Sequence, residues 1–206
     1  QLVEHGQARF GRLRVPWIGS KEQPILAKKG DDLRIDWGRL YIAAEMVGGL
    51  SSTGEVRRNF LGTIPTYNAL ASPSPIEAQS LAATFFSSFF KVTSQPVSRW
   101  LMLAYDDEFS IKYFRQNLRP YWRRNGDDAA ALLKKAAADY ESLKHRCEKF
   151  DAELMADLRN VGGEQYAQLC ALAYRQTLAG NKIVADANGQ PLMFPKENFS
   201  NGCIGT

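Results

Sequence analysis

The first half of the chain alternates apolar and polar side chains with a period of two, which is typical of β-strands. Between Ile35 and Ala44 both sides of this alternation are partly apolar, as in a strand that is covered on two faces. Glycine, proline and serine gather at 15–24, 48–55 and 71–77, where we expect loops, and 76–90 opens either as a helical turn or as a strand. The pattern predicts strands over Ala8–Val15, Leu33–Ala44, Ala83–Thr93 and Ser98–Tyr105.

In the second half the period of the pattern changes to that of an α-helix. Asn125 or Asp127 is placed to cap this helix, because both side chains accept hydrogen bonds from free backbone N–H groups. Apolar residues then recur at spacings of three and four and form one continuous stripe, which we expect to face a helical core. The stripe consists of Leu132, Ala136, Tyr140, Leu143, Cys147, Phe150, Leu154 and Leu158.

The boundaries of the helical segments follow from glycines and acidic residues. A break with a restart is expected at Asp151, and Gly162-Gly163 is expected to end the helix. A second helix is predicted over Glu164–Leu178, and Gly180 stops it. Asn188-Gly189 lies between two apolar runs, which is a strong signal for a β-hairpin with a type I′ turn.

The order of these elements predicts an α+β chain. A β-rich domain is expected over 1–121 and a helical domain with a β-hairpin over 122–206, with the boundary near Pro120–Asn125. A pair of helices with one polar face cannot complete a core by itself. We therefore expect the chain to be part of a larger protein.

Composition excludes several classes of protein. The chain has 206 residues, of which 45% are hydrophobic and 23% are charged, as in ordinary globular domains. Its net charge of +4 is scattered and forms no basic stripe, so we expect no nucleic-acid partner. No apolar run is long enough to predict a membrane span. The three cysteines form no CxxC motif and the two histidines lie far apart, so no metal site is predicted.

Four stretches of the chain carry motifs that occur together in one family. They are IDWGRLYIAA (Ile35–Ala44), YDDEFSIKYFRQNLRPYW (Tyr105–Trp122), FDAELMADLRNVGGEQYAQLCALAYRQ (Phe150–Gln176) and FPKENFSNGCIGT (Phe194–Thr206). In this order they resemble parts of the glutaminase A family. The parts are a strand of its β domain, the segment joining its two main domains, its early helical signature, and its Lys-Glu…Ser-Asn/Asp-Gly…Thr stretch.

This resemblance implies a fold, an activity and a location. Family members have a β supersandwich followed by a helical toroid of the six-hairpin type, and they hydrolyse L-glutamine to L-glutamate and ammonia. The chain would hold the later part of the supersandwich and the first one or two hairpins of the toroid. Its partners would be the small-molecule substrate and the remainder of its own polypeptide. An extracellular or periplasmic location is implied as well, and no cofactor.

The first candidate site is the cluster that follows the predicted hairpin. Hydrolysis of an amide needs an activated water, a proton donor for the leaving ammonia, and hydrogen-bond donors for the oxyanion. Glu197 is placed to activate water, and Lys196 to bind the α-carboxylate or polarise the amide carbonyl. Ser200 or Asn201 is placed to donate hydrogen bonds. The alternative is a Lys-Glu surface pair followed by an Asn-Gly turn.

The second candidate site is the acidic group that follows the strand Ser98–Tyr105. Asp106 or Asp107 is placed to act as a general acid or base at the mouth of the toroid. The alternative is a solvated turn, or a carboxylate paired with Arg115 or Arg119.

Two other functions are compatible with the same residues. A glycoside hydrolase of the same architecture would use Asp106 or Asp107 with Glu197 as its carboxylate pair. The two carboxyl groups would then lie roughly 6.5–9.5 Å apart for inversion or about 5–5.5 Å apart for retention. A non-catalytic accessory or binding module is the other possibility, since a fold does not determine a function.

Overall fold

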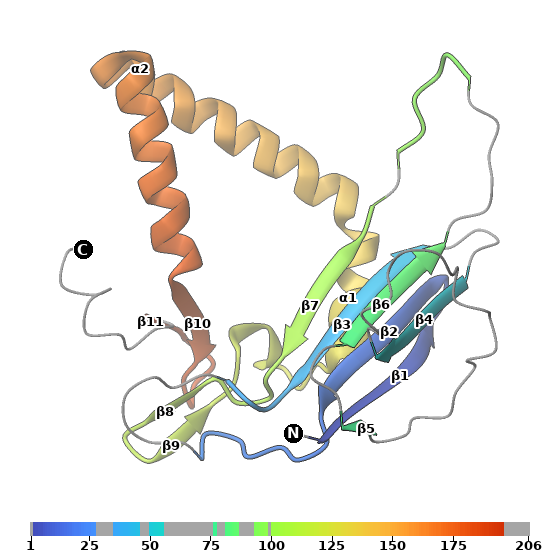
Figure 1. Ribbon diagram of the computed structural model, residues 1–206. Helices are drawn as coiled ribbons and strands as arrows, with labels where there is room; N and C mark the ends of the chain where they lie inside the picture. The colour runs from blue at the N-terminus through green and yellow to red at the C-terminus, as the bar shows by residue number, and fades with distance from the viewer. Residues whose placement is uncertain are drawn as a thin grey trace. The chain divides into compact units, whose positions relative to one another are not determined.

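The structure is a computed structural model of the 206-residue chain. It describes residues 2–27, 35–45, 50–55, 76–77, 81–86, 93–98 and 100–195. The chain divides into two compact units, one formed by Gln1–Ala27 with Ile35–Glu108 and the other by Lys28–Arg34 with Phe109–Thr206. Antiparallel strands form the first unit, and a long helix dominates the second (Figure 1). The predicted α+β class is therefore confirmed.

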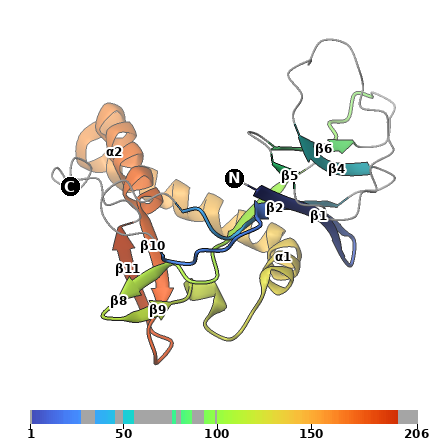
Figure 2. The same ribbon diagram turned by 60° about the horizontal axis from the view of Figure 1, so that its bottom comes forward.

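The first unit is built on an antiparallel sheet with the strand order β5-β1-β2-β3-β7. A second sheet, β4-β6, lies beside β1 and β2 (Figures 1 and 2). The core of this unit includes Leu13, Val15, Trp37 and Ala43, and Val15 is fully buried. The strands are β1 (Leu2–Phe10), β2 (Leu13–Ser20), β3 (Arg39–Glu45), β4 (Leu50–Glu55), β5 (Ile76–Glu77), β6 (Leu81–Phe86) and β7 (Met102–Asp106).

The predicted strand Ala8–Val15 is wrong, because a hairpin turn divides it. Phe10 pairs with Leu13, so the loop has two residues, and Gly11 at its first position has a φ of +62°. Glycine at this position is the mark of a type II′ turn. A two-residue loop leaves the alternation of apolar and polar positions intact, so periodicity alone cannot reveal it.

Two predicted loops are strands. β2 continues through Pro16, which lacks an N–H group and lies between the paired positions Arg14–Ala44 and Trp17–Tyr41 of β2 and β3. The segment 48–55, predicted as a loop, contains β4, which pairs with β6. Of the ambiguous segment 76–90, the described residues form β5 and β6 and no helical turn.

The second unit joins two β-hairpins to the helices. β8 (Ile111–Tyr113) pairs with β9 (Gln116–Leu118), and β10 (Asn181–Ala185) pairs with β11 (Pro191–Pro195). Between the hairpins lie the 3₁₀ helix η1 (Tyr121–Arg123), α1 (Ala129–Ala138) and α2 (Tyr140–Ala179). The hairpins lie side by side in Figures 1 and 2, and an isolated bridge between Pro120 and Val184 connects them. Within the described ranges, neither α-helix has an apolar stretch suited to crossing a lipid bilayer.

The helix boundaries that were predicted from glycines are confirmed, whereas those predicted from Asn125, Asp127 and Asp151 are wrong. The Asp128 side chain, and not Asn125 or Asp127, caps α1 by accepting a hydrogen bond from Ala131 N at 2.8 Å. The helix is continuous through Asp151, and the first interruption falls at Asp139 instead. Asp139 has a helical conformation (φ −90°, ψ 0°). The residue pattern around it does not predict an interruption of the helix.

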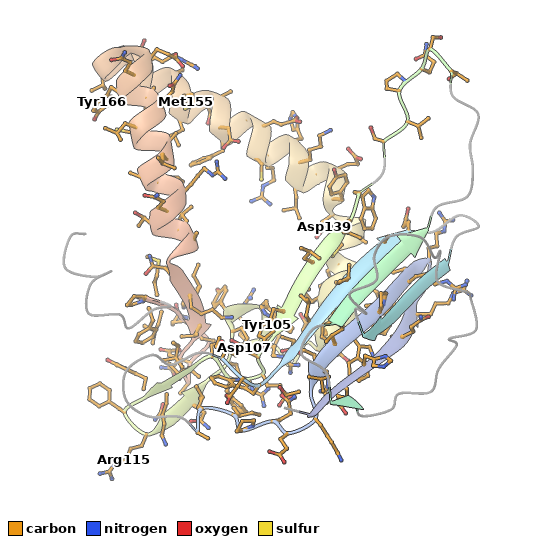
Figure 3. All side chains as sticks on the ribbon, viewed as in Figure 1. Tyr105, Asp107, Arg115, Asp139, Met155 and Tyr166 are labelled. Atoms are coloured by element: carbon orange, nitrogen blue, oxygen red, sulfur yellow. The ribbon has the colours of Figure 1, made fainter. Side chains whose placement is uncertain are left out.

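The predicted end of the helix at Gly162-Gly163 is confirmed. Gly163 has a φ of +77° and divides α2 into two arms, 140–162 and 164–179, before the helix ends at Gly180. Met155 lies on the first arm and Tyr166 on the second, both near the bend (Figure 3). An ion pair between Arg159 and Glu164 at 2.6 Å spans the break, and it lowers the pKa of Glu164.

The predicted apolar stripe of the helices is largely exposed in this chain. Leu143 is 41% exposed and Phe150 46% exposed, whereas Leu133, which is not in the stripe, is fully buried. Cys147, expected on an apolar face, is exposed as well. Phe150 and Tyr174 still contact each other across the two arms of α2, with ring centroids 6.0 Å apart.

The hairpin predicted at Asn188-Gly189 is confirmed, but its turn is not type I′. The loop spans 186–190, and Gly189 (φ +76°) is its only residue with a positive φ. Asp186 Oδ1 accepts hydrogen bonds from Asn188 N at 2.8 Å and from Gln190 N at 2.7 Å. This carboxylate stabilises the longer loop, since aspartate side chains readily accept backbone N–H groups in turns.

Candidate functional site

The cluster predicted after the hairpin lies outside the described residues. Lys196, Glu197, Ser200 and Asn201 follow directly on β11, which ends at Pro195. The described structure therefore establishes the hairpin that leads to the cluster, and the roles of its four residues stay predictions.

Asp106 and Asp107 are buried at the end of β7, which excludes the alternative of a solvated turn. Asp106 is 6% exposed and Asp107 is fully buried. Asp106 Oδ1 accepts a hydrogen bond from Glu108 N at 3.1 Å, which supports the left-handed conformation of Glu108 (φ +55°). The backbone oxygen of Asp107 accepts a hydrogen bond from Trp37 Nε1 at 2.8 Å. These contacts hold the strand end in place, and a catalytic role for either aspartate stays a prediction.

Tyr105 lies beside these carboxylates and is tied to the same tryptophan. Its hydroxyl donates a hydrogen bond to the backbone oxygen of Trp37. Burial raises the pKa of Tyr105, and the negative charges of Asp107 and Asp36 raise it further. Figure 3 shows Tyr105 and Asp107 close together. The phenol is therefore held in its neutral, donating form over the physiological pH range.

Gly38 makes this close packing possible. It has a φ of +91°, and a Cβ atom there would lie 2.6 Å from the backbone oxygen of Asp106 and 3.1 Å from Asp107 Cα. Gly11 offers a matched control, because it also has a positive φ (+62°) but a Cβ there would meet nothing within 4 Å.

We expect Gly38→Ala to reduce the free energy of unfolding by about 1–3 kcal/mol more than Gly11→Ala does, because only the first creates a clash in a packed region. Urea denaturation of both variants and the parent chain measures this difference. Equal losses for the two variants would show that β3 and β7 are not packed in this way.

The second unit contains a cavity of about 280 Å³. Its walls come from the β8–β9 hairpin, the segment after η1 and the β10–β11 turn. Ala185 N donates a hydrogen bond to Arg119 O at 3.0 Å, and the neighbouring Pro120 and Val184 are fully buried. The cavity therefore rests on a fixed backbone. It is lined by Phe109, Gln116, Asn117, Leu118, Arg119, Arg124, Ala185, Asp186, Ala187 and Gly189.

The sequence did not single out this cavity. From the sequence, Arg119 is expected only as an alternative partner for a carboxylate. The available signal was two arginines flanking the Pro120–Arg123 segment between two hairpins, and the pairing of those hairpins is a tertiary feature. No group of three or more metal-ligating side chains with suitable geometry occurs in the described part of the chain.

Comparison with models of known families assigns the chain to a family. A family model described as "Domain of unknown function (DUF5127)" matches residues 1–157, and the chain belongs to this family. A second model, "Glutaminase A six helical-hairpin domain", matches residues 163–206. This second match begins at Gly163, the residue at which α2 breaks. Together the two matches support a glutaminase A-like domain architecture. No curated protein and no solved structure matched the chain significantly.

Proposed function

We propose that this chain is part of an amidohydrolase related to glutaminase A that hydrolyses L-glutamine to L-glutamate and ammonia. The observation that carries the proposal is the match of residues 163–206 to the glutaminase A six helical-hairpin domain, directly after the match of 1–157. Lys196, Glu197, Ser200 and Asn201 all lie inside the second match. The described part of 163–206 holds one helical arm and one β-hairpin, so the remaining hairpins would come from the rest of the polypeptide.

The proposed reaction follows from the chemistry of the cluster. Glu197 takes a proton from a water molecule, whose oxygen attacks the side-chain amide carbon of glutamine. Ser200 or Asn201 donates a hydrogen bond to the oxyanion that forms, and Lys196 binds the α-carboxylate or polarises the carbonyl. The carbon–nitrogen bond then breaks, and the nitrogen leaves as ammonia after receiving the proton from Glu197. No cofactor takes part, and we place the protein in an extracellular or periplasmic compartment.

The glycoside hydrolase alternative receives less support. It needs Asp106 or Asp107 to reach a sugar, yet both side chains are buried in the described structure and Asp106 accepts a backbone hydrogen bond. The accessory-module alternative assigns no role to Lys196, Glu197, Ser200 and Asn201.

A substrate panel on the complete parent protein tests the proposal. We expect ammonia release from L-glutamine and no release of aryl groups from a set of aryl glycosides. Turnover of glycosides alone would contradict the amidohydrolase, and no turnover of either class would favour the accessory module.

A further inference from the structure

The cavity of the second unit carries more positive than negative charge. Its lining residues include two arginines, Arg119 and Arg124, and one acidic residue, Asp186. In the ranges that the structure describes, neither of these two arginines forms an ion pair. An anionic ligand would therefore find a net positive charge in this cavity, from two arginines and one aspartate.

Aromatic rings hold both guanidinium groups in place. Arg119 Cζ lies 4.5 Å from the centre of the Phe109 ring, and Arg124 Cζ lies 4.0 Å from the centre of the Tyr121 ring. Arg124 Nη1 also donates a hydrogen bond to Tyr121 O at 2.9 Å. Stacking occupies the face of a guanidinium and leaves N–H groups at its edge, where a carboxylate binds with two parallel hydrogen bonds. Both arginine side chains are exposed, and these contacts reduce the conformational freedom that they would lose when a ligand binds.

Asp186 adds an acceptor of opposite charge. Both of its backbone hydrogen bonds end on Oδ1, and within the described residues Oδ2 accepts none. These bonds fix the carboxylate, so Oδ2 is available to a cationic group of a ligand. The cavity thus combines two donors for a carboxylate with one acceptor for an ammonium group.

We propose that this cavity binds a small α-amino acid, with its carboxylate on Arg119 and Arg124 and its ammonium group on Asp186. The volume of about 280 Å³ supports a ligand of this size, because pockets for larger organic ligands span roughly 300–1,000 Å³. Gln116 and Asn117 in the lining offer further polar contacts to a side chain. The site is inferred from its own charges, and only the choice of L-glutamine as the probe rests on the proposed function.

Calorimetric titration of the 206-residue chain with L-glutamine tests the proposal. We expect saturable binding, and we expect Arg119→Gln/Arg124→Gln to weaken it at least 10-fold, because the charge-assisted hydrogen bonds to the carboxylate of the ligand are lost. Arg115→Gln is the matched control, because this exposed arginine at the tip of the β8–β9 hairpin does not line the cavity (Figure 3). Circular dichroism of each variant confirms that the chain remains folded, and single Arg124→Gln provides a milder second variant.

Two further ligands test the role of the ammonium group and the selectivity for a carboxylate separately. Glutaramate keeps the carboxylate and lacks the ammonium group, so we expect it to bind more weakly than L-glutamine. Inorganic phosphate tests a general anion site, and we expect it not to displace L-glutamine at equal concentration. Absence of L-glutamine binding, unchanged binding in the folded double variant, or equally strong phosphate binding would each overturn the proposal. These are binding measurements, so their failure leaves the proposed hydrolysis untouched.

Discussion

Replacing Glu197 by glutamine in the complete protein is expected to lower kcat for L-glutamine about 100-fold or more, because a general base of this kind contributes roughly 10²–10⁴-fold to a rate. The amide is close in size to the carboxylate but cannot take a proton from water. KM should change much less, since Lys196 and the hydroxyl and amide donors remain. Initial rates of ammonia release at several glutamine concentrations separate kcat from KM.

Glu141→Gln is the matched control for this experiment. Glu141 lies in the first turn of α2 and is exposed, so the same loss of charge occurs far from the proposed cluster in sequence. We expect its kcat to equal that of the parent protein. A change of less than twofold in Glu197→Gln would remove Glu197 from the mechanism.

Leu133→Ala is expected to reduce the free energy of unfolding by about 2–5 kcal/mol, the usual cost of removing a buried leucine side chain. Leu133 is fully buried, with a relative exposure of 0%, and it lies on α1, where Ala129 is buried as well. Urea denaturation of the 206-residue chain, followed by circular dichroism, gives the midpoint and the slope of the transition.

Leu143→Ala is the control, because it removes the same side-chain atoms from an exposed position. We expect its free energy of unfolding to fall by less than about 1 kcal/mol. A larger loss for Leu143→Ala than for Leu133→Ala would contradict the burial described for α1 and α2.

These two leucines show what periodicity can and cannot predict. The spacing of apolar residues identified helical segments and a stripe through Leu143, but it gave no sign that Leu133 is buried. A stripe states which side chains share a face, whereas burial depends on which other elements cover that face. The Gly162-Gly163 break was predictable, because Gly163 adopts a backbone conformation with positive φ that other residues rarely accept.

In the β-hairpins of both halves, the turns depend on local chemistry that the alternation of apolar and polar residues does not show. Gly11 creates a two-residue turn that keeps the period of two, so the boundary between β1 and β2 was missed. The Asp186 side chain stabilises a longer β10–β11 turn than the Asn188-Gly189 pair predicts. The boundary of 121/122 proposed for the two domains stays a prediction.

The candidate sites were predictable only where residues are adjacent in sequence. Asp106 and Asp107 were recognised as neighbours, but their burial depends on Trp37 and Gly38, which lie about 70 positions earlier. The cavity around Arg119 and Asp186 likewise joins segments from two hairpins. Such sites require strand pairing, which a single sequence does not reveal.

The most direct test of the proposed function is ammonia release from L-glutamine by the complete protein, measured beside the 206-residue chain. We predict steady turnover by the complete protein and none by the chain, because the remaining hairpins are expected to complete the reaction site. Absence of ammonia release from the complete protein, or robust turnover by residues 1–206 alone, would contradict this account.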